Sequence, residues 1–217
     1  MKINRLAVRL CMCALVLFRA LSLCADGKDS LSRKVIHMAG IDIKPAYIFP
    51  THEFFAGNNA TFSPIRKNLS VHLKYGFKFA PDTYFGRMYP HAVQGIGVGY
   101  NTFFHSSELG TPWSVYAFQT SRIASLTPRL SLDYEWNFGA SFGWKKYDAE
   151  SNPYNRVVGS KMNAYIHLSF LLNWQLDAQT NLRAGIGATH FSNGNTAYPN
   201  AGVNTLGASI GLTRYFG

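Results

Sequence analysis

The sequence predicts an all-β fold, an eight-stranded antiparallel transmembrane β-barrel. Segments of ten to fifteen residues that alternate apolar with small or polar residues recur along the chain, and this period of two is typical of strands with two different faces. No run of 18 apolar residues follows residue 25, which excludes a helical membrane protein. Aromatic residues make up 15% of the chain and charged residues only 15%, a balance that favours a membrane wall over a soluble β-sandwich.

Residues 1–25 are expected to be a secretory signal peptide, which leaves residues 26–217 as the barrel domain. Lys2, Arg5 and Arg9 give the segment a positive start, and the nine residues 10–18 that follow are all apolar. Nine apolar residues are too few to cross a membrane as a helix but are typical of the central part of a signal peptide.

The cysteines of the chain, Cys11, Cys13 and Cys24, all fall in this segment. We therefore expect a mature chain without disulfides or thiolate metal sites. A lipoprotein anchored through Cys24 is an alternative, although the bulky Leu23 makes a poor site.

Loss of the four basic residues of the expected signal peptide lowers the net charge from +10 to +6. Such an excess suits anionic lipid head groups, and no pattern indicates a nucleic-acid-binding module.

The clearest strand lies between Met162 and Trp174, where every even-numbered residue is apolar and most odd-numbered ones are polar. The same alternation recurs at 130–144 and at 69–79, where charged residues occupy the second face and mark it as the barrel interior. Eight strands are expected in all, at 38–49, 69–80, 91–104, 112–124, 129–146, 160–175, 181–192 and 204–216.

The connections alternate in length, as they do in outer-membrane barrels with short periplasmic turns and long outer loops. Residues 125–128 and 176–180 predict short turns, whereas 81–90 is longer than a periplasmic turn needs. Long loops are expected at 50–68, 105–111, 147–159 and 193–203.

A barrel of eight strands is too narrow for a pore. The inward polar residues are therefore expected to form a packed hydrogen-bond network rather than an ion path: Lys74, Asp133, Glu135 and His167.

Three polar side chains are expected together on the lipid-facing side of the last two strands. Leu182, Ala184, Ile186 and Ala188 form the outward face of the seventh strand, and His190 and Ser192 continue it. By the same parity Asn204 lies outward at the adjacent end of the eighth strand. Residues two apart on a strand stand roughly 6–7 Å apart, so a Ser–His hydrogen bond is within side-chain reach. The simpler interpretation is that polar residues at a strand end only contact lipid head groups.

The segment from His190 to Asn204 resembles the signature of the PagL lipid A 3-O-deacylase family. The resemblance implies an eight-stranded barrel in the outer membrane of a Gram-negative bacterium that removes an ester-linked acyl chain from lipid A. It also implies that Ser192 is the nucleophile and His190 the general base and acid. Asn200 would line the oxyanion hole, helped by a backbone N–H near Gly194 or Asn195.

The chain departs from the family where its acidic third catalytic residue is expected, because Asn204 stands there. An amide can hold the imidazole but cannot stabilise an imidazolium by charge. No other carboxylate is an obvious substitute, because Asp133 and Glu135 point inward and Asp42 lies too low on the first strand. The reaction needs no metal or cofactor, and the remaining histidines have no metal-ligand spacing.

The resemblance implies lipid A or lipopolysaccharide and other outer-membrane lipids as partners. The alternative to an esterase is a non-catalytic barrel with a structural or adhesion role, and a phospholipase is a third class. The sequence leaves open whether the barrel forms a homodimer, which acyl position is cleaved, and what the loop at 50–68 contacts.

Overall fold

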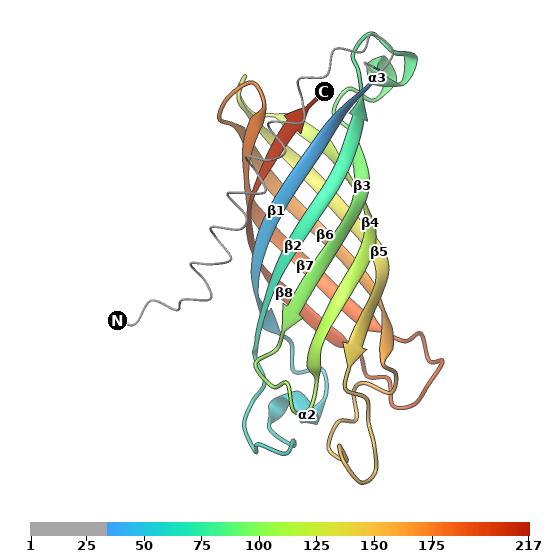
Figure 1. The fold of residues 1–217 in the computed structure, drawn as a ribbon. Coiled ribbons are helices and arrows are strands. Elements are labelled where there is room, and N and C mark those ends of the chain that lie inside the picture. The colour runs from blue at the N-terminus through green and yellow to red at the C-terminus, as the bar shows by residue number, and fades with distance from the viewer. Residues whose placement is uncertain (1–33) are drawn as a thin grey trace, which may run out of the picture.

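The computed structural model describes residues 34–217, so the expected signal peptide at 1–25 lies outside the described residues. Within 34–217, eight strands form a closed antiparallel barrel in which each strand pairs with the next and β8 pairs with β1 (Figure 1). The strands are β1 Val35–Ile48, β2 Lys67–Phe79, β3 Val93–Thr102, β4 Gly110–Ser125, β5 Leu130–Trp144, β6 Met162–Gln175, β7 Thr180–Ser192 and β8 Val203–Phe216. The predicted fold and strand order are confirmed, with bounds that differ by a few residues.

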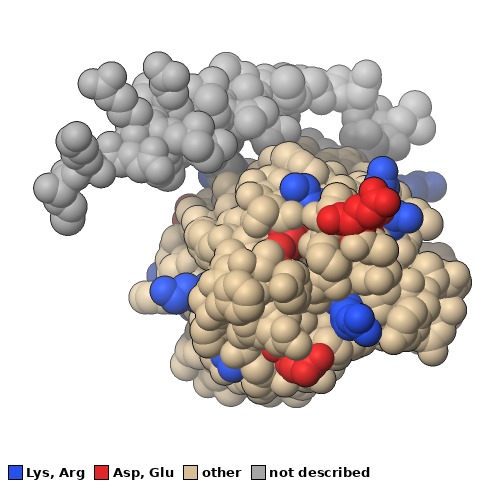
Figure 2. Space-filling view, turned by 90° about the horizontal axis from the view of Figure 1, so that it is seen from below, with Lys and Arg blue, Asp and Glu red and all other residues tan. Residues whose placement is uncertain are grey.

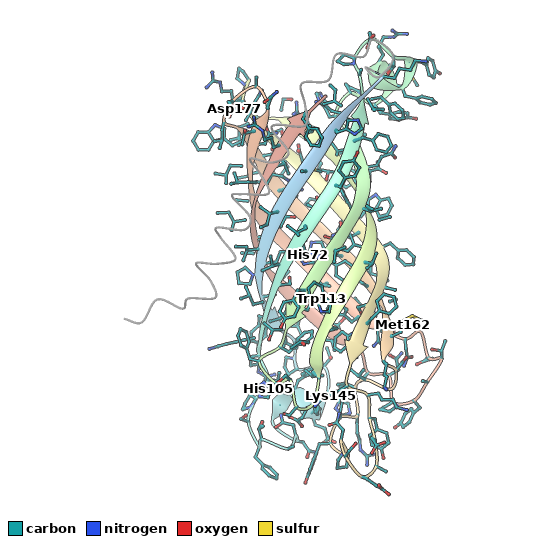
Figure 3. All side chains as sticks on the ribbon, viewed as in Figure 1. His72, His105, Trp113, Lys145, Met162 and Asp177 are labelled. Carbon is teal, nitrogen blue, oxygen red and sulfur yellow. The ribbon has the colours of Figure 1, made fainter. Side chains whose placement is uncertain are left out.

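The wall of the barrel has an apolar outer face and a polar inner face, as the alternation predicts. On β6 the residues from Met162 to Trp174 alternate between exposed apolar side chains and buried ones such as Asn163 and His167. Exposed side chains project from the wall all along the barrel in Figure 3, where Met162 is labelled near the loop end. Continuous exposed apolar surface of this kind marks a membrane-facing wall.

The predicted interior network is confirmed and is centred on Glu135. Lys74 Nζ donates to both carboxylate oxygens of Glu135, at 2.9 and 3.1 Å, and also pairs with Asp42. Arg183 pairs with the same carboxylate, and Thr120 Oγ1 donates to it at 2.9 Å. A charge removed from water is tolerated only when it is paired and hydrogen-bonded. The inward side chains around Glu135 are thus packed against one another, while a cavity of about 310 Å³, lined by residues such as Asp133 and Tyr215, remains at the end opposite the loops.

Other predicted members of the network lie toward either end of the barrel. His167 Nε2 lies 3.2 Å from Lys44 Nζ. Asp133 accepts hydrogen bonds from Ser131 Oγ and Asn173 Nδ2, both at 2.8 Å.

The long loops gather at one end of the barrel, and the short turns and the C-terminus lie at the other (Figure 1). The first loop contains α2 (Glu53–Ala56), whose Phe54 and Phe55 are fully buried. They belong to one apolar cluster with Phe103, Trp144 and Phe191, so the loops form a cap over this mouth. Figure 2 shows the capped end as a continuous surface with scattered charges.

The connection between β2 and β3, longer than a turn needs, contains α3 (Tyr84–Met88) at the end opposite the cap. Neither α2 nor α3, the helices found in residues 34–217, is long and apolar enough to span a membrane.

Candidate functional site on the outer wall

His190 and Ser192 lie at the capped end of β7, on its outward side. Asn204 opens β8 and is the cross-strand partner of His190. All three side chains are partly exposed, whereas Phe191, which lies between the first two, is buried in the aromatic cluster. The side chain of Phe191 points inward and packs in this cluster. Because neighbouring side chains on a strand point to opposite faces, those of His190 and Ser192 must point out of the barrel. The structure thus places all three residues on the outward face, as strand parity predicts, with His190 and Asn204 in contact.

A short hydrogen bond joins the imidazole to the amide. His190 Nδ1 and Asn204 Oδ1 are 2.7 Å apart. An amide oxygen only accepts hydrogen bonds, so the neutral imidazole carries its proton on Nδ1. Its Nε2 therefore has a lone pair available for a proton, which is the tautomer that a general base requires.

The hydroxyl of Ser192 is held by the loop between β7 and β8. Its Oγ accepts hydrogen bonds from the backbone N of Gly194 at 3.0 Å and from Asn200 Nδ2 at 3.3 Å. Gly194 and Asn195 both have a left-handed φ of 63°, and the tight turn that they form directs the Gly194 N–H back toward Ser192. Two of the donors expected from the sequence thus meet at the same oxygen.

The amide of Asn200 is fixed in the orientation that this contact needs. Its Oδ1 accepts from the backbone N of Asn193 at 3.1 Å, and its Nδ2 also donates to Asn195 Oδ1 at 3.1 Å. Asn195, expected as a backbone donor, therefore acts in this structure through its side chain by holding Asn200. The backbone donor at Ser192 is Gly194.

The hydrogen bond between Ser192 and His190 is not formed. Among the hydrogen bonds of residues 34–217, none joins the two side chains, because the Ser192 hydroxyl faces Gly194 and Asn200 instead. The hydroxyl proton remains available, and a rotation about χ1 changes the direction of Oγ. Nucleophile–base hydrogen bonds are often long in free enzymes and tighten when substrate binds.

Sequence reasoning missed Gly202, which allows the loop to close against the imidazole. Its φ is 73°, and a Cβ at this position would lie 3.1 Å from His190 Cε1. The Gly202 N–H also donates to Val157 O at 3.3 Å, which ties the site loop to the cap. Gly202 lies within the segment from His190 to Asn204 that resembles the family signature, and this position was the signal in the sequence. Only the folded loop shows that the glycine contacts His190.

Among residues 34–217, no carboxylate is hydrogen-bonded to His190. Glu135 is buried inside the barrel and paired with Lys74, as expected of an inward residue. Asp42, expected low on the first strand, instead lies in the middle of β1, where its buried side chain pairs with the same lysine. Glu108 is buried under the cap, where its Oε1 accepts from the backbone N of Ala60. The partner that the structure gives His190 is Asn204. Within residues 34–217 there is also no cluster of three metal-ligating side chains.

The wall around the site is apolar. Ile166 is the β6 partner of His190, Leu206 follows Asn204 on the outward face of β8, and both are exposed. The backbone N of Phe49 donates to Asn204 O at 2.9 Å, and the exposed rings of Phe49 and Tyr47 meet edge to face. A hydroxyl and an imidazole beside such a surface can reach an ester whose acyl chain lies along the wall.

A closed eight-stranded barrel with an apolar outer wall and a serine–histidine pair on that wall defines a class, the small outer-membrane barrels with a lipid-facing site. Within this class, the chain belongs to the PagL (lipid A 3-O-deacylase) family, whose family model matches residues 102–213. The match covers β4 to β7, most of β8 and every residue of the candidate site. The chain is therefore a lipid A deacylase-like barrel of the Gram-negative outer membrane.

Two solved structures show the same fold. The crystal structure of the outer membrane enzyme PagL superposes with a TM-score of 0.51 at 12% identity, covering 79% of this chain and 97% of that one. The crystal structure of Neisserial surface protein A gives a TM-score of 0.51 at 9% identity, covering 84% and 96%. No curated protein sequence matches the chain.

Proposed function

We propose that the chain is an outer-membrane serine esterase that hydrolyses an ester-linked acyl chain of lipid A by 3-O-deacylation, after export and removal of residues 1–25. The observation that carries the proposal is the 2.7 Å contact between His190 Nδ1 and Asn204 Oδ1, beside Ser192 on the lipid-facing wall. This contact places the proton of His190 on Nδ1 and leaves Nε2 free to act as a base for the hydroxyl of Ser192, in a chain that belongs to the PagL family.

The reaction follows from this geometry. His190 Nε2 takes the proton of Ser192 Oγ while the oxygen attacks the acyl carbonyl carbon. The carbonyl oxygen becomes an oxyanion, which accepts hydrogen bonds from the Gly194 N–H and Asn200 Nδ2. His190 then gives its proton to the sugar oxygen as the ester bond breaks, leaving an acyl-enzyme on Ser192. Water, deprotonated by His190, attacks the acyl carbonyl; the bond to Ser192 Oγ breaks, His190 returns its proton to that oxygen, and the 3-hydroxy fatty acid is released.

Asn204 sets the expected rate. It orients His190 and selects the productive tautomer, but it carries no charge to stabilise the imidazolium that forms in each step. In a serine protease the change from Asp to Asn lowers turnover about 10⁴-fold, largely through the wrong tautomer. Here the amide oxygen of Asn204 faces Nδ1 of His190, so the imidazole has the productive tautomer and the loss of turnover caused by a wrong tautomer does not apply. We expect slow but measurable hydrolysis.

The test is incubation of the purified protein with lipopolysaccharide, followed by mass spectrometry of released 3-hydroxy fatty acid. Wild type should release it and Ser192→Ala should not. Ser151→Ala, in the turn held by Asp148 on another outer loop, is the matched control and should behave as wild type. Identical lipid profiles for wild type and Ser192→Ala would overturn the esterase proposal.

The second candidate is a non-catalytic barrel with a structural or adhesion role. The observation that favours it is Asn204 at the position of the family's acidic residue. The same experiment separates the two, because a non-catalytic barrel leaves lipopolysaccharide unchanged at every time and protein concentration.

A further inference from the structure

The periplasmic end of the barrel carries an exposed cluster of large apolar side chains on α3. Tyr84 is 65% exposed, Phe85 52%, Met88 55% and Tyr89 58%. The segment around them, residues 80–92, has few charges, with Asp82 and Arg87 of opposite sign. Water is a poor solvent for such a cluster, so a partner of matching chemistry is expected to cover it.

This cluster, which we call the α3 patch (Tyr84, Phe85, Met88 and Tyr89), is held in a defined geometry. Thr83 Oγ1 donates to Ala80 O at 2.7 Å and accepts from the Gly86 N at 3.0 Å. A Cβ on Gly86 would clash with Ala80 O, so glycine is required for this tight return of the chain. The patch is therefore a fixed surface.

The position of the patch identifies what covers it. On β2 the outward residues Tyr75, Phe77 and Phe79 form an aromatic column that belongs to the lipid-facing wall. Phe85 packs on Phe79 with ring centroids 5.2 Å apart, and Phe79 packs on Phe77 at 5.7 Å. The α3 patch thus continues the outer wall at its periplasmic end and does not turn over the barrel mouth. Figure 1 shows α3 at the edge of the barrel, beside the end of β2.

We propose that the α3 patch is a membrane anchor that inserts into the interfacial region of the periplasmic leaflet, with phospholipids as its partner. Aromatic side chains are enriched at both interfaces of outer-membrane barrels, where an apolar ring and a polar hydroxyl meet lipid and water at once. Tyr84 and Tyr89 have this character, and Arg87 at the end of the helix suits lipid phosphates. The proposal does not depend on the esterase activity.

The test places a fluorescent label on the patch and asks whether lipid reaches it. In the mature chain, residues 26–217, which contains no cysteine, Tyr84→Cys or Tyr89→Cys is labelled with nitrobenzoxadiazole and folded into phosphatidylcholine vesicles. Some vesicles contain spin-labelled phosphatidylcholine, which quenches only fluorophores in contact with lipid. Both variants leave the Phe85–Phe79 contact in place.

Two further positions calibrate the measurement. Leu73→Cys, outward in the middle of β2, reports lipid contact and correct insertion. Ala178→Cys lies in the exposed turn between β6 and β7, next to Asp177, which Figure 3 labels at the same end of the barrel. The expected result is several-fold stronger lipid quenching at 84 and 89 than at 178. Weak lipid quenching at 84 and 89, equal to that at 178, would overturn the proposal. Shielding from aqueous iodide without lipid quenching would also overturn it, since a protein would then cover the patch.

Discussion

His190 and Asn204 face each other across the β7–β8 pair, and their side chains meet at 2.7 Å between Nδ1 and Oδ1. Because the two residues are direct cross-strand partners, the contact is set by strand register and does not depend on loop conformation. The site therefore has a rigid half, the imidazole and amide on two strands, and a loop-borne half, the donors around Ser192.

Changing Asn204 to Asp should raise the esterase activity. The carboxylate is isosteric with the amide and would stabilise the imidazolium by charge without moving His190. We expect a rise of roughly tenfold or more in kcat, with about 10⁴-fold as the limit known for the reverse change in a serine protease. Rates of 3-hydroxy fatty acid release by Asn204→Asp and by wild type are compared directly.

Asn204→Ala should lose most of the activity while the barrel stays folded, and full activity in that variant would contradict the orienting role of Asn204.

Asn200→Ala should lower kcat about 10²–10³-fold, the effect of removing one oxyanion donor. The fatty-acid release assay measures it under saturating lipopolysaccharide. The matched control is Asn58→Ala, an exposed amide in the first outer loop, which should keep the wild-type rate. Equal rates for Asn200→Ala and wild type would remove Asn200 from the proposed oxyanion hole.

Gly202→Ala should impair activity through the position of His190. The added methyl group would lie 3.1 Å from the imidazole, in a left-handed conformation that costs an L-residue about 1–2 kcal/mol. Gly143→Ala is the control, because φ at Gly143 is 89° but its Cβ would meet only ordinary contacts far from His190. Both variants should be less stable to urea, and only Gly202→Ala should lose activity. A loss of activity in both would mean that backbone strain alone is responsible.

Lys74→Met should destabilise the barrel by about 3–5 kcal/mol, because it leaves Asp42 unpaired and Glu135 with fewer partners in the interior. Urea unfolding of protein folded into vesicles, followed by tryptophan fluorescence, measures the change. Lys67→Met, exposed at the outer end of the same strand, should shift the unfolding free energy by no more than about 0.5 kcal/mol. Similar midpoints for the two variants would show that the buried pairs contribute little.

Much of the fold could be predicted because strand alternation is a local property. The residues of β6 reveal their two faces without any neighbour, and the same parity assigns His190, Ser192 and Asn204 to the outer wall. The interior carboxylates could be predicted for the same reason. The conformation of α3 could not be, because its fold depends on the close approach of Gly86 to Ala80.

The sequence by itself determined the barrel, the outward direction of the site residues and the neutral residue at position 204. Only the tertiary structure decided that two of the expected donors reach the Ser192 hydroxyl: the loop after β7 turns through Gly194 and Asn195 and brings Asn200 back to this oxygen. It also decided that His190 Nδ1 contacts Asn204 and that Gly202 closes on the ring. The physical reason is that strand faces follow from a repeat of two residues, whereas hydrogen bonds between residues eight or more apart depend on register and loop closure.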